Sequence, residues 1–285
     1  MRVIAVAISA LIVGLSALCV NATTLIRVGT YQDHTQAIKS FLGQNGCESL
    51  ATASVGENQI LAEYLIFCNA LKQSDGDYDI QLYSYPLNAR ILDDIESGFL
   101  DASVIGIWQN ELHSHDYVAS APLLRRNEFV KGLYTTKEQL SVLSRRASLH
   151  GSVVLVNSNW YHDWAMLNCS SLKPVHVDKY ENMFRMLSAQ RGDVIPLTFS
   201  NKPDMERNQF GIPLFPVPGF KLAFDDTTHY AISTKTDSAQ ALRRDINAGL
   251  AVLREKGLIE ALYTRLGIID SAVSDWQQIG VCDNG

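Results

Sequence analysis

The sequence predicts an α/β protein made of two related lobes. Amphipathic helical patterns alternate with short apolar runs of strand length, which is typical of α/β folds. The segment ILDDIESGFLDASVIG (residues 91–106) joins a short helix, a glycine break and a buried strand that opens at Asp101. The segment MFRMLSAQRGDVIPL (residues 183–197) repeats this order and opens its strand at Asp193. Two copies of so common a unit can be coincidence, but two lobes that each carry it explain the repeat better.

The first part of the chain has the order strand, helix, strand, helix, strand. An irregular stretch with a short helix is expected over residues 33–56, which contain three glycines and no strong period. The regular elements are a strand over residues 25–29, a helix over 60–71, a strand over 78–83, a helix from 91 and a strand over 102–107. Helices between successive strands favour a mostly parallel sheet.

The remainder of the chain continues the α/β pattern and ends in two helices. Three prolines and Gly219 lie between residues 213 and 219, which favours an extended, rigid crossing. Strands are expected over residues 130–134, 153–156, 175–177, 194–195 and 229–233, and the final helices over 239–253 and 258–266.

The N-terminus has the pattern of a secretory signal. Residues 1–22 contain Arg2, an apolar run and small residues that end at Ala22, so we expect cleavage near Ala22 and a periplasmic location. The whole chain carries a formal charge of −6, and loss of Arg2 makes it one unit more negative. Because no basic cluster remains, a nucleic-acid partner is disfavoured.

Four cysteines remain after the expected cleavage: Cys47, Cys68, Cys169 and Cys282. An even number in an exported chain indicates disulfides, and four thiols allow three pairings. Cys47 precedes the helix that contains Cys68, so this pair is the first choice, and buried free thiols are the alternative. The spacing fits no zinc signature. A metal site at His113, His115 and Asp116 is improbable, and no cofactor is expected.

Aromatic and polar side chains follow several of the predicted strands. Ligands of open α/β sheets bind in the crevice at such strand ends, and free amides at a helix N-terminus suit an anion. The alternatives are an ordinary surface tyrosine at Tyr31, a Trp108 that packs under its own loop, and a Ser158 that only caps its helix. We further expect Trp108 and Phe199 to face each other between the lobes. The candidate ligand-binding residues are Tyr31, Trp108, Asn110, Ser158, Trp160, Tyr161, Thr198 and Phe199.

Several segments resemble the family 3 solute-binding proteins, the type II periplasmic binding proteins that feed ABC transporters. The likeness rests on the start IRVGT, the segments at residues 91–106 and 183–197, and the tail HYAISTKTDSAQALRRDINAGLAVLREKGLIEALYTRLGI. The resemblance covers most of the chain after residue 22. It implies a two-lobed type II periplasmic-binding-protein fold with a hinge and an interlobe cleft. The implied domains are residues 23–124 with 224–285 as lobe 1, and residues 125–223 as lobe 2.

The chain departs from this family where the family binds amino acids. Amino-acid-binding members carry an arginine shortly after the position of Gly106 and an aspartate at the end of the second lobe's strand. Here these positions fall near His113 and on Thr198. The departures put the binding of an ordinary α-amino acid in doubt, and Arg125 or Arg126 is the candidate for a displaced cation. In the implied fold Cys169 and Cys282 lie in different lobes, which disfavours a bond between them.

The resemblance implies a monomeric periplasmic receptor for a small polar solute, amino-acid-like or related, that delivers it to an ABC permease. A ligand-sensing partner of a membrane receptor is the alternative, and the sequence does not separate the two. A dehydratase-like enzyme that uses His113 with Glu111 as acid and base is a third, weaker interpretation, because no nucleophile or oriented triad is evident. We therefore expect a binding protein and no enzyme.

Overall fold

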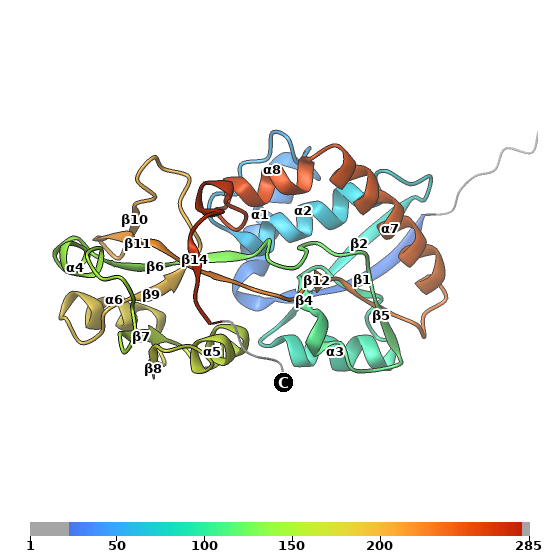
Figure 1. The fold of residues 1–285 in the computed structure, drawn as a ribbon. Coiled ribbons are helices and arrows are strands. Elements are labelled where there is room, and N and C mark those ends of the chain that lie inside the picture. Colours follow the sequence, from blue (N-terminus) through green and yellow to red (C-terminus); the bar gives the residue numbers. More distant parts are fainter. Residues whose placement is uncertain (1–22, 281–285) are drawn as a thin grey trace, which may run out of the picture.

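The computed structural model describes residues 23–280 and has two lobes joined by long strands (Figure 1). The signal peptide expected over residues 1–22 and Cys282 lie outside the described residues. No helix within residues 23–280 has the length and apolar character needed to span a bilayer.

The first lobe is built on a five-stranded sheet with the order β2-β1-β3-β13-β5. The expected parallel pairing holds for its first three strands, since β1 is parallel to both β2 and β3. β13 is antiparallel to both of its neighbours. The strands are β1 (Thr24–Tyr31), β2 (Tyr78–Tyr85), β3 (Ala102–Ser103), β5 (Tyr117–Ala119) and β13 (Ala231–Ser233).

Helices cover this sheet, and α2 (Gln59–Leu71) is buried along almost its whole length. It packs against α7 (Ala239–Glu255), α8 (Leu258–Arg265) and α1 (Gln32–Asn45) (Figure 1). The expected irregular stretch after β1 is thus largely the regular helix α1. Only Thr35 and Ile38 of α1 are buried. So narrow a buried face leaves no apolar period in the sequence, which explains the difference.

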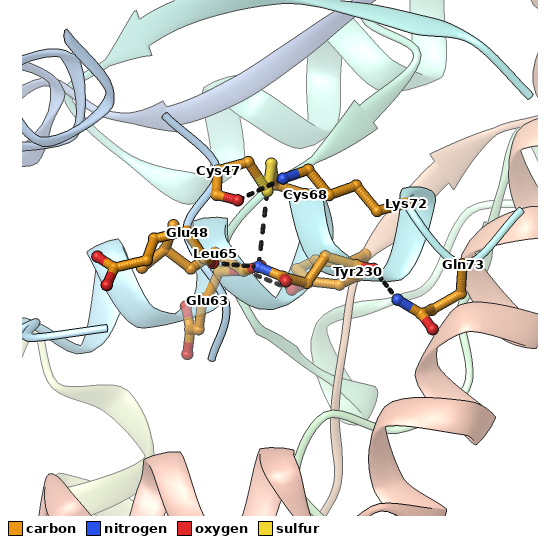
Figure 2. Close-up of a disulfide and its surroundings, with 9 residues drawn as sticks. Cys47, Glu48, Glu63, Leu65, Cys68, Lys72, Gln73 and Tyr230 are labelled. Carbon is orange, nitrogen blue, oxygen red and sulfur yellow. Dashed lines mark hydrogen bonds between the residues drawn. A yellow bond between two sulfur atoms is a disulfide. The ribbon is translucent and has the colours of Figure 1, made fainter. Parts of the chain in front are cut away.

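The expected Cys47–Cys68 disulfide is confirmed, and it ties the turn after α1 to helix α2 (Figure 2). The Lys72 ammonium donates to the Cys47 carbonyl at 2.5 Å, and the Asn69 amide donates to the Glu48 carbonyl at 2.8 Å. Through these bonds, residues at the end of α2 hold the turn that contains Cys47 and Glu48. Cys169 is disulfide-bonded as well.

The second lobe has a mainly antiparallel sheet with the order β10-β11-β6-β9. Beside it β7 (Val153–Val156) and β8 (Lys173–His176) form a parallel pair, and a bridge from Val154 to Val194 connects this pair to the larger sheet. The larger sheet consists of β6 (Val130–Thr136), β9 (Ile195–Leu197), β10 (Arg207–Gln209) and β11 (Ile212–Ala223). The helices of this lobe are α4 (Lys137–Leu143), α5 (Tyr161–Asn168) and α6 (Tyr180–Ser188).

Strands β6 and β11 pair with each other and connect the lobes (Figure 1). The proline-rich stretch is extended, as the sequence predicts, and lies within β11. The register of the pair shifts between Pro216 and Lys221. Proline has no N–H to donate, so an irregular pairing is expected there.

The repeated segment occupies equivalent places in the two lobes. After α3 (Asn88–Ser97), Gly98 has φ +82°, and after α6, Gln190 has φ +56°. Each lies three residues before the aspartate of its copy, Asp101 or Asp193. Each aspartate carboxylate accepts the backbone N–H at the adjacent parallel strand, of Arg27 at 2.8 Å and of Val153 at 2.7 Å. These matching backbone turns and hydrogen bonds support the prediction of two related lobes.

Part of the C-terminal segment contacts the second lobe. Residues 224–285 are expected in lobe 1, but β14 (Gln277–Gln278) pairs with β11 of lobe 2. The 3-10 turn η2 (Ser271–Val273) places Val273 in the core of lobe 2, and Trp276 packs edge-on against Phe199 at 5.5 Å. The chain therefore returns to lobe 2 after helix α8, because apolar side chains of the tail find partners there.

Candidate functional site

An aromatic cluster lies where the two lobes meet. Trp108, at the end of β4 (Ile107–Trp108), pairs through its backbone with β12 (Thr228–His229) of lobe 1. Its ring is stacked on Phe129 at 5.7 Å and lies 5.4 Å from Phe224. The His162 ring on helix α5 of lobe 2 is 4.5 Å away. Trp108 therefore contacts both the strands that connect the lobes and the facing lobe.

Lys131 on β6 lies beside this cluster and forms an ion pair with Asp163. Its ammonium binds both carboxylate oxygens of Asp163, at 2.7 and 2.8 Å. The same ammonium is 5.4 to 5.5 Å from the ring centres of Phe129, Trp160 and Phe224. Aromatic faces attract a desolvated cation, so this ion pair is held rigidly. The charge of Lys131 is thus balanced within lobe 2 by Asp163.

His162 combines an interlobe contact with an unsatisfied nitrogen. Its Nε2 atom is buried and has no hydrogen-bond partner among residues 23–280. Burial lowers the pKa of His162, the nearby Glu111, Asp226 and Asp163 act in the opposite direction, and Lys131 lowers it further. The neutral imidazole is therefore favoured. Its free nitrogen, beside Trp108, is suited to one hydrogen bond with a bound molecule.

The lobe 1 side of the site is organised around a buried carboxyl group. Glu63, 1 % exposed, accepts the backbone N–H of Gly106 at 2.8 Å and the Gln59 amide at 2.8 Å. Burial raises the pKa of Glu63 to about 7. Gly106 has no side chain, which allows this close approach. Glu63 thus fixes the turn that leads into Trp108.

Tyr31 lies near the same carboxyl group, at the end of β1. Burial raises the pKa of its hydroxyl, and the charges of Glu63 and Glu111 raise it further. The charge of Glu111 thus acts on the pKa values of both Tyr31 and His162. Glu111 and Asp226 take part in none of the ion pairs found in residues 23–280. This side of the site is therefore electronegative.

Of four further candidates, Asn110, Trp160 and Tyr161 lie beside residues of this region, whereas Ser158 is bonded to His176. Asn110 is exposed on the 3-10 turn η1 (Gln109–Glu111), and its N–H points to Asp226 at 3.4 Å. Tyr161 is 63 % exposed on α5 and contacts the His162 ring edge-on at 5.5 Å. Trp160 faces Lys131, as above. The Ser158 N–H donates to His176 at 3.0 Å, and no side-chain cap closes α5.

The last three candidates lie apart from the aromatic cluster. Arg125 is exposed, and the neighbouring Arg126 pairs with Asp225 at 3.0 Å. The Thr198 carbonyl and hydroxyl accept hydrogen bonds from Arg207 at 2.5 and 2.8 Å. Phe199 is fully buried in the core of lobe 2.

The expected pairing of Trp108 with Phe199 is not present. Phe199 contacts Tyr134 and Trp276 within lobe 2, whereas Trp108 contacts His162 and the rings of the connecting strands. The returning C-terminal segment covers Phe199, which the sequence pattern does not indicate. The lobe 2 partner of Trp108 is instead His162.

No group of three or more metal-ligating side chains occurs in residues 23–280. His113 and His115 lie in the loop after η1, and the His113 N–H donates to the Tyr117 hydroxyl at 3.3 Å. The aromatic cluster thus brings together several rings, one imidazole nitrogen without a hydrogen-bond partner and nearby carboxylates, and groups of these kinds can contact a small polar molecule.

The fold is that of the two-lobed periplasmic binding proteins. It is similar to the probable amino-acid ABC transporter extracellular-binding protein YtmK of Bacillus subtilis, with a TM-score of 0.56 and 13% identity over 86% of this chain and 98% of that one. It is also similar to substrate-binding domain 2 of Lactococcus lactis GlnP in its open conformation, with a TM-score of 0.51 and 12% identity over 87% and 96%. In sequence, no family profile matches this chain. No curated protein matches it in sequence either.

Sequence reasoning missed several residues of the site. His162 stands in the aromatic stretch that the sequence singled out, but nothing there shows its contact with Trp108. Phe129 directly precedes β6 and Phe224 directly follows β11. The two residues are far apart in the sequence, so no local pattern indicates that their rings meet. Glu63 has a weak signal, because a charged residue at a buried position of an otherwise apolar helix requires a partner.

Proposed function

We propose that this protein is an exported receptor that captures a small polar solute between its lobes. The main support is the contact of Trp108 in lobe 1 with His162 in lobe 2. A solute that touches both residues binds the closed arrangement better than the open one, and so shifts the lobes toward closure. Tyr31, Asn110, Ser158, Trp160 and Tyr161 stay in the proposal as walls and hydrogen-bonding groups.

The proposal is tested by native mass spectrometry of freshly purified protein, followed by thermal shifts with the molecule that co-purifies. Replacing Trp108 or His162 by alanine should weaken binding at least tenfold. The matched control is His150→Ala, because His150 is exposed on lobe 2 and outside the site. Equal affinity of all three variants and the unchanged protein would exclude this site.

Two membrane partners are compatible with such a receptor. We favour an ABC permease, and a membrane sensor that reads the closed form is the second candidate. Uptake of the labelled solute by cells that lack the protein distinguishes them: a transport receptor is required for uptake, whereas a sensor is required only for the response to the solute.

A dehydratase-like enzyme is the least supported candidate. The Glu111 carboxylate accepts a hydrogen bond from Asn88 at 3.0 Å, and the hydrogen bond of His113 is through its backbone. No contact between the two side chains supports an acid–base pair. Turnover of the co-purified molecule that is lost in Glu111→Gln and His113→Ala would establish the enzyme instead.

A further inference from the structure

The strand pair that carries Trp108 packs against a buried carboxyl group of helix α2. The two oxygens of Glu63 accept the Gly106 N–H and the Gln59 amide, each at 2.8 Å. Gly106 directly precedes β4, where Trp108 pairs with Thr228 of β12. A Cβ atom on Gly106 would lie 3.1 Å from the Glu63 Oε1 atom and 3.3 Å from the Thr228 hydroxyl oxygen. Both strands of the pair therefore face this carboxyl group.

Glu63 is buried without a cation to balance a negative charge. It takes part in none of the ion pairs found in residues 23–280. The acids that flank the Trp108 strand pair in sequence, Glu111 and Asp226, have the same sign. An unpaired carboxylate inside a protein is costly, so the neutral form is favoured. Burial accordingly raises the pKa of Glu63 to about 7, although its two hydrogen bonds oppose the shift.

We propose that Glu63 is a positioning residue whose proton holds the Trp108 strand pair in the arrangement that meets His162, so that solute binding is coupled to proton uptake. This inference rests on the proposed receptor function and adds to it a regulation by pH. The 1 % exposure of Glu63 belongs to the arrangement in which the lobes meet. Lobe separation admits water to the site, and water favours the charged form. The closed, solute-bound form therefore holds the proton more tightly than the open form.

Two hydroxyl groups supply the structural response to ionisation. The hydroxyls of Thr228 and Tyr263 are buried and have no hydrogen-bond partner among residues 23–280. A carboxylate accepts several hydrogen bonds, and buried donors without a partner are attracted to it. Ionised Glu63 therefore attracts the Thr228 hydroxyl as well as the Gly106 N–H. Both groups belong to the strand pair that positions Trp108.

The other titratable groups that act on this region are neutral or paired near pH 7. Burial raises the pKa of three tyrosines, which are Tyr31 on β1, Tyr230 before β13 and Tyr263 on α8. The Tyr230 hydroxyl also donates to the Glu63 carbonyl at 2.5 Å (Figure 2). Arg254 and Glu128, which act on Tyr263 with opposite signs, form an ion pair at 3.0 Å.

Two histidines lie on or beside the Trp108 strand pair. His229 of β12 is hydrogen-bonded to the Thr227 hydroxyl and the Ser120 carbonyl, each at 2.7 Å. The His162 ring contacts Trp108 from lobe 2. Burial lowers the pKa of both histidines below the ordinary value of 6.5. Both are therefore largely neutral above pH 6.5, and a change in affinity above this pH is assigned to Glu63.

The first test follows the Gly106 amide and needs no solute. Labelling with ¹³C-carbonyl isoleucine and ¹⁵N-glycine selects the amides of Ile–Gly pairs, which occur in this sequence at Gly106 and Gly280. In the mature chain the Gly106 signal should shift as the pH rises through about 7. Glu63→Gln should abolish the shift, whereas Glu96→Gln, at an exposed position of α3, should keep it. The Gly280 signal is the internal control.

A Gly106 signal that does not move in the unchanged protein overturns the proposal, and this result does not depend on the folding of any variant. A signal that moves equally in Glu63→Gln overturns it as well.

The second test measures the affinity for the molecule that co-purifies with the protein, at pH 6.5 and 8. One coupled proton weakens binding by at most about tenfold per pH unit. The affinity of the unchanged protein should therefore fall several-fold relative to Glu63→Gln, a comparison that corrects for titration of the molecule itself. Glu96→Gln should behave as the unchanged protein. An equal pH dependence of the unchanged protein and Glu63→Gln overturns the coupling.

The two tests separate this inference from the receptor function. Compaction by a solute whose affinity has no Glu63-dependent pH profile would keep the receptor and reject the coupling. A Gly106 signal that follows Glu63, in a protein that no solute compacts, would keep the proton-dependent position of the strand pair and reject the receptor.

Discussion

Replacing Glu63 by glutamine should remove a specific pH dependence of stability. The carboxyl group is 1 % exposed, and burial raises its pKa from 4.5 to about 7, although the Gln59 amide and the Gly106 N–H partly oppose the shift. Raising the pKa from 4.5 to about 7 corresponds to about 3 kcal/mol. The group is fully buried, so solvent screening reduces this value little.

The sign follows from where the proton is held. Between pH 4.5 and 7 the folded protein keeps the proton on Glu63, whereas the unfolded chain releases it. The free energy of unfolding therefore falls as the pH rises through this window, and this contribution is constant above it. The lost stability equals the free-energy cost of ionising the buried Glu63 carboxyl group in the folded protein.

Urea unfolding of the unchanged protein and of Glu63→Gln from pH 4.5 to 8 measures this effect. As the pH rises from 4.5 to 7, the unchanged protein should lose about 3 kcal/mol of unfolding free energy relative to Glu63→Gln. Glu96→Gln, at an exposed position of α3, is the control and should show no such shift. A pH-independent difference for Glu63→Gln would refute the reasoning about the buried carboxyl group.

Two further predictions concern the frame of lobe 1. Replacing Cys47 and Cys68 by serine opens a link between residues 21 apart and should cost about 3 kcal/mol of unfolding free energy, measured with urea; a loss under 1 kcal/mol would contradict it. A Cβ atom at Gly249 would lie 2.0 Å from the Ala70 carbonyl oxygen, so Gly249→Ala should destabilise the α2–α7 contact by about 1 to 3 kcal/mol. Gly43→Ala is the control, since its Cβ meets nothing within 4 Å, and equal melting temperatures of the two variants would reject the packing argument.

The sequence predicts the frame of the protein well because the frame depends on local patterns. Strand β1, helix α2 and the repeated helix–strand unit all follow from apolar spacing. The length of helix α1 is underestimated, since only a short helix is expected there, because α1 buries only two side chains. The return of the C-terminal segment to lobe 2 depends on contacts of Val273 and Trp276 with residues far away in the chain, and no local pattern encodes these.

The site is predicted less completely, for the same reason. Tyr31, Trp108 and Trp160 stand at strand and helix ends, where position along the chain is informative. The contact of Trp108 with His162 and that of Arg207 with Glu57 join separate lobes, so they depend on how the lobes meet. Phe199 follows a strand as Trp108 does, but the C-terminal segment covers it.

The most direct test of the receptor is small-angle X-ray scattering of the mature protein with and without its co-purified solute, after the solute is removed by partial unfolding and dialysis. A solute held between the lobes should decrease the radius of gyration, and Trp108→Ala should abolish the decrease at the same solute concentration. An unchanged radius of gyration at saturating solute would contradict closure of the lobes around a ligand.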